Sequence, residues 1–185
     1  MEQSVSRMRA VGGGIVAGIV GGLVIKIIGV LMTASAGGDV WVALKASAAP
    51  FLGARAMQPG PDALAVFFGL VSHFAVSIVW GVLFGVLFFG VSRGATVLLG
   101  ALWGIVVWLG MYYVVLPLIG MSAIARGAPL GPAIFLHIVF GLFVGLGFLP
   151  YQRRRLPLGA AAETPAQRST RGGRDLEPPG THPPT

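Results

Sequence analysis

Four long apolar runs constrain the fold of this chain more than any other feature. In the second run, no residue between Asp62 and Arg93 carries a formal charge. A helix of about 20 apolar residues is enough to cross the roughly 30 Å of hydrocarbon in a bilayer. Of the 185 residues, 55% are hydrophobic and 10% are charged, which excludes an ordinary soluble domain. The sequence therefore predicts an all-α integral membrane protein, a bundle of four transmembrane helices.

We expect a membrane domain at residues 10–150, preceded by a short polar segment at 1–9. Its spans are predicted at about 10–33, 62–90, 95–119 and 132–149. The link between the second and third spans is short, which predicts an antiparallel hairpin. Asp62 is placed to cap the second span, and Pro132 suits the first position of the fourth. Pro117 lies near the end of the third span, where a kink costs few backbone hydrogen bonds.

The first run has a second interpretation. Its basic start, its apolar core and the small residues Ala34-Ser35-Ala36 match the pattern of a cleaved signal peptide. The run is longer than the roughly 7–15 residues of a signal core and contains Lys26. Both features favour a retained helix, whereas cleavage would leave three spans.

The segment between the first two spans, residues 34–61, has mixed composition. Asp39 is placed to cap a short helix, and the residues after it form an approximate apolar stripe. Trp41 and Lys45 suit a helix that lies in the headgroup region of the first outer loop. The alternative is an ordinary loop with some helical turns.

Basic residues near the ends of the spans predict the orientation of the protein. An even number of spans puts both termini on one side, and that side carries six flanking basic residues against three. They are Arg7, Arg9, Arg93, Arg153, Arg154 and Arg155, against Lys45, Arg55 and Arg126. The positive-inside rule then predicts cytoplasmic termini for a multi-pass protein of a bacterial cytoplasmic (inner) membrane. These flanking residues account for most of the +7 net charge, so we expect a lipid bilayer and no nucleic acid as partner.

The chain changes character at residue 151. Residues 151–185 are basic, rich in proline and too poor in apolar residues to form a core. We expect this segment to be a disordered cytoplasmic tail.

Glycine recurs every fourth residue along the runs and predicts where helices touch, because small residues let helix backbones approach closely in a membrane. The glycines expected at helix contacts are Gly14, Gly18, Gly22, Gly69, Gly81, Gly85, Gly100, Gly104, Gly141 and Gly145. These rows exceed what four helices need for internal contacts. The row from Gly14 to Gly22 is the expected surplus face, which predicts a homo-oligomer.

The same rows carry polar members that form a candidate layer at similar depth. They are Lys26, His73, Ser77, Tyr112 and His137. An ionisable residue inside a membrane marks a functional site by default, and histidine can carry protons near neutral pH. The structural alternative is that each histidine bonds its own carbonyl or hydroxyl, while Lys26 reaches towards the headgroups. Helix rise places His73 about 8 Å deeper than His137, so we expect no direct contact between them.

Little else in the spans carries chemistry. No Asp or Glu lies within the apolar body of a span, which leaves ion coupling by carboxylates and paired-carboxylate catalysis without residues. Two histidines make an incomplete zinc site, and the chain contains no cysteine. We therefore expect no enzyme activity, no cofactor and no metal.

Several short motifs resemble a known family. They are HFAVSIV at 73–79, GAL at 100–102, PLIGM at 117–121 and the helix around His137. Over roughly residues 65–148 the chain is similar to the YagU-like small inner-membrane proteins of bacteria. The resemblance implies a four-helix membrane protein and assigns no catalytic residue, because the family has no established activity. Some relatives carry symporter-like names, but these residues contain no recognisable sodium or substrate site.

Two classes of function are consistent with these residues. The first is a non-enzymatic structural or accessory protein that packs through its glycine ridges. The alternative is a small transporter or channel component, in which the polar layer takes part in proton or solute passage. The two differ in whether water reaches the histidines.

Overall fold

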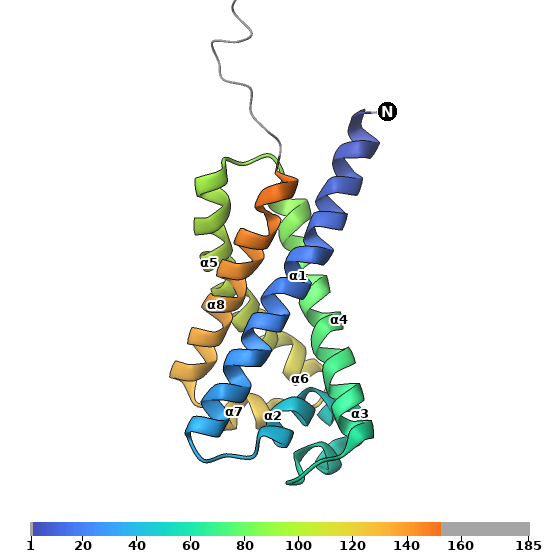
Figure 1. The fold of residues 1–185 in the computed structure, drawn as a ribbon, viewed down its shortest axis with the longest axis vertical. Coiled ribbons are helices and arrows are strands. Elements are labelled where there is room, and N and C mark those ends of the chain that lie inside the picture. Colours follow the sequence, from blue (N-terminus) through green and yellow to red (C-terminus); the bar gives the residue numbers. More distant parts are fainter. Residues whose placement is uncertain (1, 153–185) are drawn as a thin grey trace, which may run out of the picture. The chain divides into compact units, whose positions relative to one another are not determined.

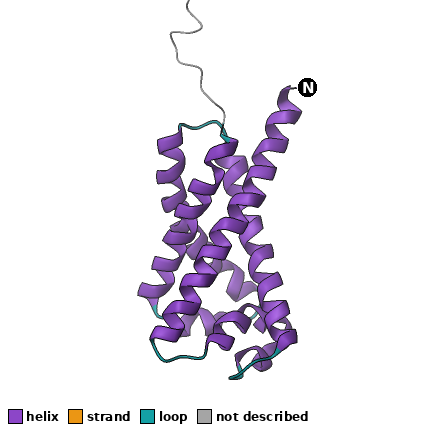
Figure 2. Ribbon diagram, in the orientation of Figure 1, coloured by secondary structure: helices purple, strands orange, loops and turns teal. Residues whose placement is uncertain are grey.

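A computed structural model describes residues 2–152, and this part of the chain is helical and contains no strand (Figure 2). Four helices are long and apolar enough to cross a membrane: Ser6–Ser35, Ala63–Phe88, Arg93–Leu118 and Leu130–Tyr151. The prediction of an all-α four-helix bundle is confirmed. The chain is therefore a multi-pass membrane protein.

The long helices are α1 (Glu2–Ser35), α4 (Ala63–Phe88), α5 (Arg93–Gly110) and α8 (Leu130–Phe148). The third span continues from α5 through a π-helical turn, η3 (Met111–Val115), into α6 (Leu116–Leu118). Short helical turns fill the connections: α2 (Val40–Lys45), η1 (Ala46–Ala48), α3 (Ala49–Leu52), η2 (Gly53–Met57) and α7 (Ser122–Gly127). We call the end of the bundle with these turns the loop end. The opposite end is the termini end, where α1 begins and α8 runs into η4 (Leu149–Tyr151) (Figure 1).

The four apolar helices match the predicted spans, but some helix ends lie at other residues than expected. Helix α1 begins at Glu2 rather than at residue 10. Helix α8 begins at Leu130 behind Pro129, so Pro132 is its third residue rather than its first. Residue 152, assigned to the disordered tail, has a buried side chain. Its Nε2 donates to Thr96 Oγ1 at 2.8 Å, and Gln152 thereby ties the end of the fourth span to the start of α5. The rest of the predicted tail lies outside the described residues.

Helices α4 and α5 run antiparallel, as the short link predicts, but their backbones approach each other little (Figure 1). Instead α4 packs on α1, α5 packs on α8, and α1 packs on α8. Aromatic side chains fill the space between α4 and α5. The rings of Trp80 and Trp103 meet edge to face with centroids 5.8 Å apart, and Trp103 Nε1 donates to the Trp80 carbonyl oxygen at 3.2 Å.

The predicted glycine ridges do lie at contacts within the chain. A Cβ atom added at Gly18 would collide with the backbone of Ser77 and Ile78 in α4. One added at Gly104 would collide with the backbone of His137 in α8, and Gly141 faces Gly104 in return. Gly69 differs from the others, because it lies against Leu44 and Lys45 of the loop-end turns.

The homo-oligomer prediction loses its basis, since the row chosen as a surplus face is already occupied. Gly14 and Gly18 lie against the backbone of α4, and Gly22 lies against the Ser77 side chain. Face-to-face glycine contact on both α1–α4 and α5–α8 explains why these pairs approach closely.

The loop-end turns fold over the α1–α4 side of the bundle instead of forming one headgroup helix. Asp39 caps α2 as predicted, accepting from the backbone nitrogen of Trp41 at 2.7 Å. Lys45 is 1% exposed, and its Nζ donates to the carbonyl oxygens of Gln58 and Gly60 at 2.6 and 2.7 Å. Lys45 is therefore enclosed by the short turns, which bring backbone carbonyls around its ammonium group, and the segment matches the alternative of a loop with helical turns.

Asp62 caps α4 as predicted and accepts from the backbone nitrogen of Ala65 at 3.1 Å. Its carboxylate also pairs with Arg55, whose Nε lies 2.7 Å from Oδ2. The hydrogen bond from Arg55, followed by the one from Ala65, lowers the Asp62 pKa to about 2. The cap is therefore charged at neutral pH, at the helix N-terminus where a negative charge is favourable.

Candidate functional site

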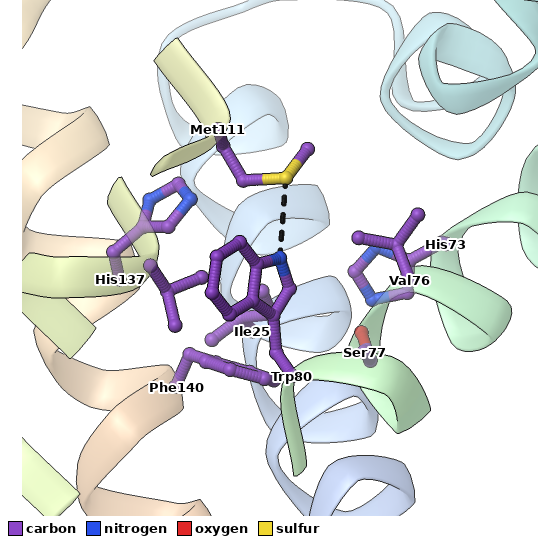
Figure 3. Close-up of a pocket in the computed structure, with 9 residues that line it drawn as sticks. Ile25, His73, Val76, Ser77, Trp80, Met111, His137 and Phe140 are labelled. Atoms are coloured by element: carbon purple, nitrogen blue, oxygen red, sulfur yellow. Dashed lines mark hydrogen bonds between the residues drawn. The ribbon is translucent and has the colours of Figure 1, made fainter. Parts of the chain in front are cut away.

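A cavity of about 90 Å³ lies between the four long helices and η3, in the half of the bundle nearer the loop end (Figure 3). Its lining includes Ile25 from α1 and Phe140 from α8. Its polar lining consists of His73, Ser77 and Trp80 from α4, Met111 from η3 and His137 from α8. Of the candidate layer, the cavity thus brings together His73, Ser77 and His137. In Figure 3 the two imidazoles lie on opposite sides of Trp80.

His73 reaches across from α4 to α1, where its Nε2 lies 2.8 Å from the carbonyl oxygen of Gly22. A carbonyl oxygen can only accept, so this nitrogen carries the hydrogen in the neutral ring, and Nδ1 keeps its lone pair. Gly22 also lacks a side chain, which leaves room for Ser77 directly beside it. One glycine therefore allows both polar residues of α4 to approach α1.

His137 bonds within its own helix, and its Nδ1 lies 2.7 Å from the carbonyl oxygen of Ala133. By the same reasoning Nδ1 carries the hydrogen in the neutral ring, and Nε2 keeps its lone pair. The two histidines therefore have separate backbone partners, as the structural alternative predicts. They also have opposite tautomers, each with one acceptor nitrogen left over.

The cavity contains hydrogen-bonding groups that the protein does not pair. Within residues 2–152, the structure gives no hydrogen bond to Nδ1 of His73, to Nε2 of His137 or to the hydroxyl of Ser77. Polar groups in a membrane interior are costly unless they find a partner. A volume of about 90 Å³ has room for about three waters at the density of the liquid. The arrangement is thus suited to hold water against the acceptor nitrogens and the hydroxyl that line the cavity around Trp80.

Opposite tautomers give a direct spectroscopic prediction. In nanodiscs near neutral pH, ¹⁵N spectra of labelled histidine should show a protonated Nε2 for His73 and a protonated Nδ1 for His137. Signals can be assigned by removing one histidine at a time, and His182, outside the described residues, is removed first. Two histidines with the same tautomer would contradict the hydrogen bonds described above.

Two members of the predicted layer, Lys26 and Tyr112, do not line the cavity. Lys26 is not among the residues that line the cavity, and its Nζ donates to the carbonyl oxygen of Ala43 at 3.3 Å. This contact points towards the loop end, in keeping with the alternative that Lys26 reaches out of the hydrocarbon. Tyr112 packs edge to face on His137, with ring centroids 5.7 Å apart, but lines a different pocket.

Sequence reasoning missed two residues of the site. Trp80 lines the cavity between the two imidazoles, and its Nε1 donates to Met111 Sδ at 3.3 Å (Figure 3). Met111 starts the π-helical turn, in which the backbone nitrogen of Leu116 bonds the Met111 carbonyl. The sequence feature that could have predicted this turn is Pro117. Proline has no N–H to donate, and its ring clashes with the carbonyl four residues earlier. A wider turn before proline relieves that clash, and such turns are frequent at functional sites.

Fold and cavity together define a four-helix membrane protein with a polar centre. Comparison with protein-family models, curated proteins and solved structures finds no match to the chain. The function is therefore inferred from the geometry of the cavity.

Proposed function

We propose that this protein is a small transporter or channel component of the bacterial cytoplasmic membrane, with cytoplasmic termini. Its central cavity holds water and takes up protons. One observation carries the proposal: two acceptor nitrogens and a free hydroxyl from two helices line the same cavity. Histidine is the side chain suited to bind and release protons near neutral pH. Ser77 can both donate and accept, so it can connect waters on either side of it.

The competing role, packing against a partner through glycine ridges, has less support. The ridges on α1, α4, α5 and α8 contact one another inside this chain. The carbonyl bonds of His73 and His137 suit a purely structural role, yet each uses only one ring nitrogen. A dry structural interior would gain nothing from leaving the second nitrogens unpaired around a cavity.

The cavity is closed towards the termini end by a tightly packed cluster of large side chains. Its buried members are Phe84, Trp103, Val107, Phe140, Val144 and Phe148, together with Ala17. The rings of Phe84 and Phe148 meet edge to face at 5.8 Å. Passage through the whole membrane therefore requires these rings to part, and the structure represents a state closed on that side.

Hydration of the cavity can be measured directly, because the chain has no cysteine of its own. We expect Ser77→Cys to react with silver ions in proteoliposomes. The matched control is Val144→Cys, a fully buried position in the closed cluster, which should stay unreacted. Unreacted thiols are counted with a maleimide dye after the protein is unfolded in detergent. Equal protection of both cysteines would mean a dry cavity and would overturn the proposal.

A further inference from the structure

We infer that a second pocket, at the loop end, is the entrance to the central cavity, and that the Tyr112 ring closes the passage between them. This inference rests on the proposed function and adds the side from which the cavity fills. The entrance pocket has a volume of about 360 Å³. Its lining comes from η3, α6, α7 and the start of α8, and includes Tyr112, Tyr113, Ser122, Arg126 and Leu130.

One helical turn separates the two spaces. Met111 lines the central cavity, whereas the next two residues, Tyr112 and Tyr113, line the entrance pocket. The Tyr112 ring lies edge-on against the His137 ring, which belongs to the cavity lining. A residue of the entrance pocket thus touches a residue of the cavity, and the Tyr112–His137 contact is the barrier between the two.

The barrier depends on ring packing. Besides His137, the Tyr112 ring contacts Trp108 with centroids 6.0 Å apart. Within residues 2–152 the structure gives no hydrogen bond to the Tyr112 hydroxyl. A change of side-chain rotamer at Tyr112 would therefore break these ring contacts without breaking a hydrogen bond of its hydroxyl.

The other routes by which water could enter the cavity are covered by protein or face lipid. Val76 lines the cavity and is 37% exposed, so the cavity also opens sideways beside α4, but this opening lies in the middle of a span and faces hydrocarbon. Towards the termini end lies the closed aromatic cluster that includes Phe84 and Phe148. At the loop end, α2 and η1 cover the α1–α4 side, where the backbone of Leu44 and Lys45 lies against Gly69. The side of α5 and α8, where the entrance pocket opens, is therefore the route that we infer for water.

The test compares silver-ion reactivity of Ser77→Cys alone, with Tyr112→Ala and with Tyr113→Ala. Tyr113 is the matched control, because it lines the same pocket but is 65% exposed and has no ring contact with His137. Removal of the Tyr112 ring should raise the reaction rate by about tenfold or more, while Tyr113→Ala should leave it unchanged. Tyr112→Leu keeps much of the packing volume and serves if Tyr112→Ala does not fold.

Two single cysteines report the side of approach. Ala123→Cys in α7 marks the loop end and Ser92→Cys marks the termini end, and both positions are exposed. Silver should reach position 77 from the side that labels position 123. Reaction at position 77 that ignores Tyr112, or that comes from the side of Ser92, would overturn the entrance and leave the hydrated cavity standing. Protection at position 77 in every variant, equal to that at Val144→Cys, would overturn both proposals.

Discussion

Replacing Gly104 by alanine should destabilise the folded protein by about 1–3 kcal/mol, the usual cost of adding a methyl group to a well-packed contact. The obstacle at this position is the His137 backbone of α8, with His137 C and Ile138 Cα also close to the added atom. A backbone cannot move aside by a rotamer change, so α5 and α8 must separate. The change should appear as a lower unfolding temperature in mild detergent.

Gly29 provides the matched control, because it also lies inside a long helix. A Cβ atom at Gly29 meets nothing within 4 Å. Gly29→Ala should therefore leave stability unchanged or raise it slightly, since alanine restricts the unfolded chain and favours the helix. Equal unfolding temperatures for Gly104→Ala and Gly29→Ala would show that the α5–α8 contact is looser than described.

The fold was largely predictable because its strongest determinants are local. Length and apolarity define the spans, and the four-residue spacing of Gly100, Gly104, Gly141 and Gly145 marks the α5–α8 contact. The spacing of glycines within one helix does not determine which other helix their ridge packs against. The row at Gly14 was therefore assigned to a second copy, although α4 of the same chain covers it.

The candidate site was predictable in part for a similar reason. The four-residue rows singled out His73, Ser77 and His137, and the structure brings them to one cavity although helix rise places His73 about 8 Å deeper than His137. Depth alone does not fix the direction of a side chain around its helix. Lys26 consequently turned out to bond a loop-end carbonyl. The role of Trp80 required knowledge of the separation between α4 and α5, which no local pattern encodes.

The second large effect concerns the histidines themselves. Replacing both should abolish proton uptake by the cavity while leaving their carbonyl bonds in place. His73 donates from Nε2 and His137 from Nδ1. Glutamine places its amide nitrogen near the position of Nε2, and asparagine near that of Nδ1. His73→Gln with His137→Asn therefore keeps both donors and removes both titrating groups.

The most direct measurement of the central claim is proton flux into proteoliposomes, driven by a potassium diffusion potential and followed with an internal pH dye. Wild-type protein should exceed empty liposomes, and the double variant should fall to the empty-liposome rate with its unfolding temperature near that of wild type. His182→Gln, which changes the remaining histidine in the tail, should keep the wild-type rate. A double variant that conducts like wild type, or a wild type no faster than empty liposomes, would contradict a proton pathway through this cavity.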